Sequence, residues 1–154
     1  MTKLLLSLHV LAAIVAIGPV TVAASMFPAA TRRALTTGED RDVAVLRTLN
    51  RICRVYAALG IAVPLFGLFT ASSLDVLGDA WLITSIALTA VAAGVLVLAV
   101  LPRQQAVLDG FGREPVAVDV KWPARLAMHT GLFNVLWAVV TVLMIVRPGS
   151  TTGA

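Results

Sequence analysis

The chain has 154 residues, of which 59% are hydrophobic and 13% are charged. A typical soluble domain is about half apolar and about one quarter charged, and it could not bury this much apolar surface. The composition therefore excludes an ordinary soluble fold. The single cysteine, Cys53, also excludes a disulfide framework and a thiolate metal cluster.

Long uncharged stretches divide the chain into four segments. A bilayer core of about 30 Å is crossed by roughly 20 helical residues, and the stretches near that length are 4–27, 55–74, 80–102 and 126–146. Backbone groups in lipid must bond within the chain, and no stretch alternates in polarity as barrel strands do. We predict an all-α integral membrane protein, a single domain over 1–154 that forms a four-helix antiparallel bundle.

The first stretch has a second interpretation, a cleaved signal peptide. Lys3 precedes it, and Val22-Ala23-Ala24 resembles a cleavage site. The apolar run from Leu4 to Phe27 is longer than the apolar region of a signal peptide. We therefore favour a first membrane span.

Basic residues are unequally distributed between the two sides of this bundle. The first and third loops together hold ten of them: Arg32, Arg33, Arg41, Arg47, Arg51, Arg54, Arg103, Arg113, Lys121 and Arg125. The other side has only Lys3 and Arg147. Because Lys and Arg collect in cytoplasmic loops, we predict cytoplasmic long loops and both termini on the outer side. This topology accounts for the basic charge, so nucleic acid is not an expected partner.

The second helix is predicted to begin well before its membrane span. Thr37 as N-cap with Asp40 three residues later resembles a capping box, and no Pro or Gly follows until Gly60. The resulting amphipathic extension, about 39–54, has one apolar side formed by Leu46, Leu49, Cys53 and Tyr56. A different side carries Arg47, Arg51 and Arg54. These arginines reflect either positive-inside bias alone or a basic face for anionic lipid or an acidic partner.

Proline and glycine mark the remaining irregular segments. Pro64 and Gly18-Pro19 each predict a kink inside a span. The third loop is expected to continue as helix through Leu108 and then to turn and extend toward the fourth span. The tail, 148–154, is rich in Pro, Gly and Thr, and we expect it to be disordered.

Small residues in the second span predict a helix-packing face. They recur at spacings of three and four, as Ala57, Gly60, Pro64, Gly67 and Ala71. In lipid, such residues let helix backbones approach closely.

The fourth span carries an inward-facing line of polar residues: Thr130, Asn134, Trp137 and Thr141. One interpretation is interhelical hydrogen bonding, worth about 0.6 kcal/mol per bond. The other is a polar path, or a pocket for a headgroup or cofactor.

Two histidines are the titratable groups of interest inside the spans. No Asp, Glu, Lys or Arg lies within a span, so a proton relay or a carboxylate active site lacks its parts. His9 is near the outer boundary and His129 near the inner one, about 18 Å apart along the membrane normal. They cannot share one metal. Each is either a hydrogen-bonded interfacial side chain or a ligand in its own site.

Short motifs resemble known membrane families. The opening Leu8-His9-Val10-Leu11-Ala12-Ala13-Ile14, followed by Gly18, resembles the first helix of a family of small four-span bacterial membrane proteins of unknown function. The segment from Trp81 to Leu101-Pro102-Arg103-Gln104-Gln105 resembles the same family. More distantly, the Leu-His opening is similar to the copper-resistance membrane proteins and to the bacterial haem-linked protoporphyrinogen oxidase, where a first-helix histidine is implicated in haem or metal binding.

The resemblance implies a bacterial plasma-membrane location and makes His9 a candidate ligand of haem b. Only His9 carries over from those relatives, because this sequence lacks their further charged and Met-rich intramembrane positions. This departure argues against enzymatic and copper-transport roles.

Three functional hypotheses follow. The first, which the sequence favours, is a non-catalytic accessory or stabilising subunit of a larger membrane assembly, in contact with the bilayer and with other subunits or a second copy. The alternative is a haem-b or metal-binding redox protein with His9 as axial ligand. The third is a small-molecule or lipid transporter lined by Thr130, Asn134 and Thr141, which would require at least a dimer.

Overall fold

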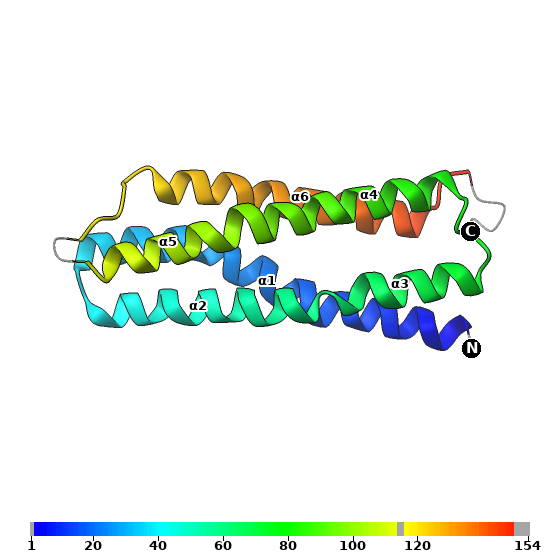
Figure 1. Cartoon of the computed structure of the whole chain (residues 1–154), viewed down its shortest axis with the longest axis horizontal. Helices are drawn as coiled ribbons and strands as arrows, with labels where there is room; N and C mark the ends of the chain where they lie inside the picture. Colours follow the sequence, from blue (N-terminus) through cyan, green and yellow to red (C-terminus); the bar gives the residue numbers. More distant parts are fainter. Residues whose placement is uncertain (1, 114–115, 150–154) are drawn as a thin grey trace.

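The computed structural model describes residues 2–113 and 116–149, and within them the chain is helical with no strand. The helices form four antiparallel rods (Figure 1). In chain order the elements are α1 (Thr2–Thr37), α2 (Asp40–Leu59), α3 (Ala62–Ser73), α4 (Ala80–Gly94), the π-helix η1 (Val95–Val100), α5 (Leu101–Phe111) and α6 (Trp122–Val146). The second rod joins α2 and α3, and the third joins α4, η1 and α5. The predicted all-helical bundle is confirmed to this extent.

Each of the four rods is long and apolar enough to cross a membrane. They measure 35, 34, 32 and 25 residues. At 1.5 Å per residue the first three span about 50 Å, well beyond the thickness of a hydrocarbon core. The prediction of four long apolar helices is therefore confirmed, and three of the rods extend beyond their apolar portions.

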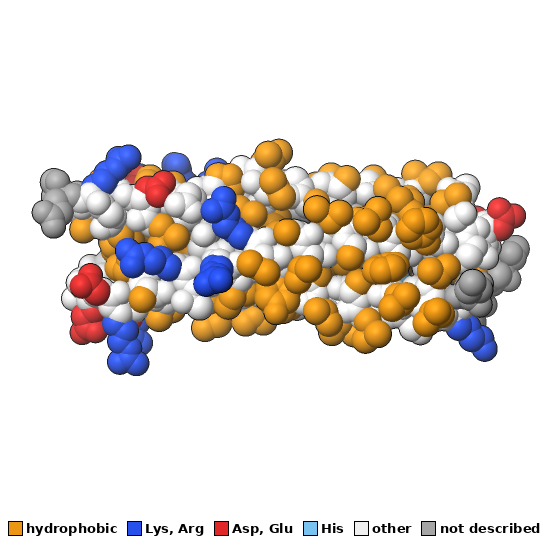
Figure 2. Space-filling model, turned by 60° about the horizontal axis from the view of Figure 1, so that its bottom comes forward, with side chains coloured by type: hydrophobic (Ala, Val, Ile, Leu, Met, Phe, Trp, Pro, Cys, Tyr) orange, Lys and Arg blue, Asp and Glu red, His pale blue; other side chains and the backbone are white. Residues whose placement is uncertain are grey.

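The two ends of the molecule differ in charge. α1 begins and α6 ends at one end, which we call the terminal end, together with the turn between α3 and α4 (Figure 1). At the opposite, basic end lie the α1–α2 turn and the loop after α5. Lys and Arg side chains gather toward the basic end, and hydrophobic side chains cover most of the remaining surface (Figure 2).

The turn between α1 and α2 corrects the predicted capping box. α1 continues to Thr37, and Gly38 ends it with a left-handed φ of 67°, a conformation that glycine adopts without steric cost. The N-cap of α2 is therefore Glu39. The Thr37 hydroxyl contacts the Asp42 carboxylate instead, at 2.7 Å, and Arg33 pairs with the same carboxylate at 3.2 Å.

The breaks within the rods fall only partly where proline predicts them. Pro64 cannot donate to the carbonyl of Gly60, and the second rod is interrupted at Gly60 and Ile61, one turn before the proline. α1, by contrast, remains helical through Pro19 and Pro28. The third rod widens into η1 without a proline inside it, a feature that the sequence did not predict.

α1 lies at the centre of the packing. It contacts α2, α3 and α6, whereas α4 packs mainly on α6. The main apolar core draws on α1, α2, the third rod and α6, and its largest fully buried side chains include Phe27, Phe133, Leu46 and Leu126. A smaller cluster of Ala71, Trp81 and Leu82 closes the terminal end.

Candidate functional site

The polar line of α6 divides between the interior and the surface. Thr130 is buried at 2% exposure, Asn134 and Trp137 are half-buried, and Thr141 is exposed. The Thr141 hydroxyl donates to the Trp137 carbonyl of its own helix at 2.9 Å. The expectation that all four residues face inward is therefore wrong for Thr141, which is exposed and whose hydroxyl is satisfied within its own helix.

Three polar atoms of this line are buried without a hydrogen-bond partner in the described part of the chain: Thr130 Oγ1, Asn134 Oδ1 and Trp137 Nε1. They include an acceptor, a donor and a hydroxyl that can act as either. Buried groups of this kind each cost about 1–3 kcal/mol when unsatisfied. The centre of the bundle thus retains hydrogen-bonding capacity that its own side chains do not use.

One member of the line connects α6 to α1. The Asn134 side-chain amide donates to the Ser25 hydroxyl at 3.1 Å. Ser25 is exposed and Asn134 is half-buried, so the bond lies at the edge of the α1–α6 contact. It brings hydrogen-bonding groups to the surface of the bundle, where they lie among exposed apolar side chains such as Met26 and Val135.

A small-residue stripe on α6 runs beside this bond. Its members are spaced by three and four residues: Ala124, Ala127, Gly131, Asn134, Ala138 and Thr141. All are exposed except the half-buried Asn134. A Cβ atom at Gly131 would meet nothing within 4 Å, and the same holds for Gly18 on α1, seven residues before Ser25. This flank of α6 is therefore unfilled by the protein itself.

His9 joins α1 to α3. Its ring is 8% exposed, and Nδ1 lies 2.9 Å from the carbonyl oxygen of Val63. The ring edge rests on Gly67, where an added Cβ would lie 3.0 Å from Cε1. Glycine allows this close approach, because a side chain at position 67 would displace the imidazole by a few tenths of an ångström.

This geometry defines what His9 can do chemically. A carbonyl oxygen only accepts, so Nδ1 carries the hydrogen, and in the neutral ring Nε2 keeps a free lone pair. A ligating histidine is commonly oriented by such a bond from its second nitrogen. Nε2 is therefore the one ring atom of His9 that could ligate a metal, and within the described residues no group of three or more His, Cys, Asp or Glu side chains could hold a metal ion.

His129 has a local role. Its Nδ1 lies 2.6 Å from the Arg125 carbonyl oxygen, one turn earlier on α6. The two histidines therefore bond to different helices, and the structure does not bring them into one site.

The residues of the predicted helix-packing face make separate contacts and do not form one continuous interface. Gly67 contacts His9, Ala71 belongs to the cluster at the terminal end, and Ala57 packs against the main core. Gly60 is half-buried and Pro64 is exposed. The break at Gly60 and Ile61 separates these residues between two helices.

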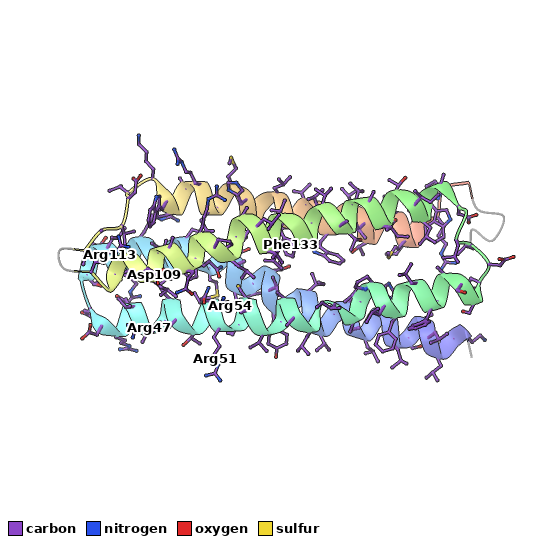
Figure 3. The ribbon with its side chains drawn as sticks, in the orientation of Figure 1. Arg47, Arg51, Arg54, Asp109, Arg113 and Phe133 are labelled. Carbon is purple, nitrogen blue, oxygen red and sulfur yellow. The ribbon has the colours of Figure 1, made fainter. Side chains whose placement is uncertain are left out.

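The extension of the second helix has the predicted division of sides. Leu46, Leu49 and Cys53 are buried, and Tyr56 is half-buried. Arg47, Arg51 and Arg54 are exposed, and Arg51 points away from the bundle (Figure 3). Their common exposure leaves both interpretations of the basic face open to test.

A buried polar contact between α2 and α5 was missed from the sequence. The Asn50 amide donates to the Gln104 side-chain oxygen at 3.1 Å, and the Gln104 amide lies 3.5 Å from Cys53 Sγ. Asn50 and Gln104 are 5% and 0% exposed. Asn50 follows Leu46 by four residues on the apolar side of the extension, and this spacing is the signal that would have identified it.

No protein-family model matches the chain, and no curated protein or solved structure matches it either.

The fit of His9 on Gly67 generates a prediction for stability. Gly67→Ala places a Cβ 3.0 Å from the imidazole, and we expect a loss of about 1–3 kcal/mol from overpacking. In a His9→Ala background the same change should cost clearly less, because the opposing ring is gone. Thermal unfolding in detergent of the wild-type protein, the two single variants and the double variant measures these losses.

Gly94→Ala is the matched control, since a Cβ there would meet nothing within 4 Å. Equal losses for Gly67→Ala with and without His9 would contradict the proposed contact.

Proposed function

We propose that the protein is a multi-pass membrane protein whose four rods cross the bilayer, with the basic end in the cytoplasm and both termini on the outer side. The lengths and apolar character of the rods support the crossing. The gathering of Lys and Arg toward one end (Figure 2) supports this orientation, because cytoplasmic segments retain basic residues. The resemblance noted above supports a bacterial plasma membrane.

Reporter fusions test this orientation. Alkaline phosphatase, which is active outside the cytoplasm, should be active when fused after Arg147 and inactive when fused in the loop after Gly112. Green fluorescent protein, which does not mature outside the cytoplasm after unfolded export, should give the opposite pattern. The reversed result at both sites would overturn the orientation.

Within this membrane setting we propose a non-catalytic role as an accessory subunit that binds another transmembrane helix, either of a larger assembly or of a second copy. The observation that carries it is the small-residue stripe on α6 beside the bond between Asn134 and Ser25. Lipid tails offer helices no hydrophobic gain on association, so helices in membranes associate through small residues and polar contacts. The stripe supplies both on one exposed flank.

The length of the stripe along α6 is suited to binding a partner helix. Its residues extend from Ala124 to Thr141, over about 25 Å of helix. A partner helix lying along it would cover exposed backbone at Gly131 and reach the polar pair at its midpoint. The apolar portions of the rods contain no Asp, Glu, Lys or Arg, which favours binding over proton or ion chemistry.

Site-specific photo-crosslinking in intact cells tests the interface. A photoreactive amino acid at Val135, which is 60% exposed beside Asn134, should give one discrete protein adduct. The same probe at Leu98, 78% exposed on η1, should react with lipid only. Gly131→Leu should abolish the Val135 adduct by separating the two backbones.

The mass of the adduct distinguishes a second copy from a different subunit. Crosslinking at Val135 to lipid alone, or an adduct unaffected by Gly131→Leu, would refute the proposed interface.

A second candidate function is haem-b binding through His9. It is favoured by the bond from Nδ1 to Val63, which directs the lone pair to Nε2 as in a ligating histidine. Bound haem would supply one-electron redox chemistry. Its test is optical: the protein purified from haem-supplemented cells should show a Soret band that disappears in His9→Ala and persists in His129→Ala. No Soret band in the wild-type protein would end this candidate.

A further inference from the structure

A groove lies between α5 and α6 at the basic end, apart from the polar line and from His9. Arg103, Ala106, Trp122 and Arg125 line it, and its volume is about 190 Å³. Arg103 follows the end of the third apolar stretch, and Arg125 precedes the start of the fourth. The two arginines therefore lie at corresponding heights on antiparallel rods, where the apolar surface ends.

The two arginines of the groove have no carboxylate partner within residues 2–113 and 116–149. Among the described residues the only ion pair is Arg33 with Asp42, on the α1–α2 turn. The neighbouring acidic side chains have other partners: Asp109 accepts from the Gln105 amide at 2.9 Å, and Asp119 accepts from the Lys121 backbone N–H at 2.8 Å. Neither arginine of the groove is therefore ion-paired with a carboxylate of the described residues.

The arginine on α5 is held in place. Arg103 Nη1 donates to the carbonyl oxygen of Ala99 in η1 at 3.1 Å. A guanidinium has five N–H donors, so most of them remain available to an external acceptor. Anchoring by one bond reduces the conformational entropy that binding a ligand would cost.

The other lining residues are suited to the headgroup boundary. Trp122 is half-buried and begins α6, and tryptophan prefers this zone because its ring is apolar and its indole N–H is a donor. The first turn of α6 adds the partial positive charge of a helix N-terminus. Ala106 gives the groove an apolar floor. The combination of an apolar floor and a cationic rim matches a lipid, in which a phosphate adjoins acyl chains.

We propose that this groove binds the phosphate of an anionic phospholipid, with Arg103 and Arg125 holding the headgroup from two rods and Trp122 contacting the start of the acyl chains. Basic pockets between membrane helices on the cytoplasmic side are sites of this kind. The bound lipid joins α5 to α6, two helices that otherwise have few direct contacts. This inference rests on the membrane placement proposed above, and not on the accessory role.

Native mass spectrometry of the full chain in a mild non-ionic detergent tests the site. Phosphatidylglycerol and phosphatidylcholine with the same acyl chains are titrated separately. We expect one phosphatidylglycerol to bind at least about tenfold more tightly than phosphatidylcholine. Arg103→Gln with Arg125→Gln should remove most of that preference, since each basic residue near an anionic headgroup contributes about fivefold.

The matched control is Arg32→Gln with Arg41→Gln, which removes the same charge at the same end from exposed positions outside the groove. This control should change the affinity for phosphatidylglycerol by less than about twofold. Equal losses in the two double variants would show diffuse attraction to the basic surface and would overturn the site. Equal binding of both lipids to the wild-type protein would also overturn it.

Three further measurements distinguish the remaining outcomes. Soluble glycerol phosphate at the same concentration should not displace the lipid, and displacement would assign the groove to a free phosphate instead. Arg103→Lys with Arg125→Lys, which preserves charge, should recover part of the binding if the glutamine variants are folded. Resistance of the protein to carbonate extraction from membranes reports insertion separately, so its loss would refute the membrane placement and not the groove alone.

Discussion

In a bilayer, apolar surface cannot hold helices together, because the surrounding lipid is as apolar as the helices themselves. The bundle proposed here therefore depends on close backbone approach and on a few polar contacts between rods. α1 makes more of these inter-rod contacts than the other helices, since it packs against α2, α3 and α6. Its contact with α3 combines close approach and a polar contact: the His9 ring rests on Gly67, and its Nδ1 bonds to the Val63 carbonyl.

The polar contacts between rods are distributed along the length of the molecule. His9 joins α1 to α3 in the half nearer the terminal end, and Asn134 joins α6 to α1 near the middle. Asn50 joins α2 to α5 in the half nearer the basic end. Each contact connects a different pair of rods, so together they specify which helices are neighbours. The apolar side chains between them fill space but could pack in other arrangements.

Hydropathy and charge were sufficient to predict the four rods, because each depends on a property summed over some 20 residues. Local details depended on single residues and were predicted less well. Thr37 has the sequence signature of an N-cap, yet Gly38 ends α1 only after it and moves the cap to Glu39. The π-helix η1 has no proline, glycine or polar residue within it to mark it.

For the candidate site residues, too, the periodic pattern was predicted well and the individual contacts were not. The spacing of Thr130, Asn134 and Trp137 was sufficient to place them on one side of a helix, but their partners could not be inferred. Ser25, the partner of Asn134, lies 109 residues away in sequence. Val63, the partner of His9, lies 54 residues away, and a backbone carbonyl has no sequence signature. The spacing of Asn50 from Leu46 could have placed it on the apolar side of the extension, but its partner Gln104 lies 54 residues away on another helix and could not be inferred.

The arginines illustrate how one sequence feature can serve two physical roles. In the proposed topology they orient the chain as a group, and for that purpose any position in the loops is equivalent. Their placement in the structure is not equivalent, since Arg51 points away from the bundle (Figure 3) whereas Arg103 and Arg125 line a groove between two rods. Charge that serves orientation alone would have no reason to converge from separate helices on one site. Convergence at the level where the apolar surface ends is what a bound headgroup requires, because its phosphate must meet cations there while its acyl chains remain in contact with the apolar rods.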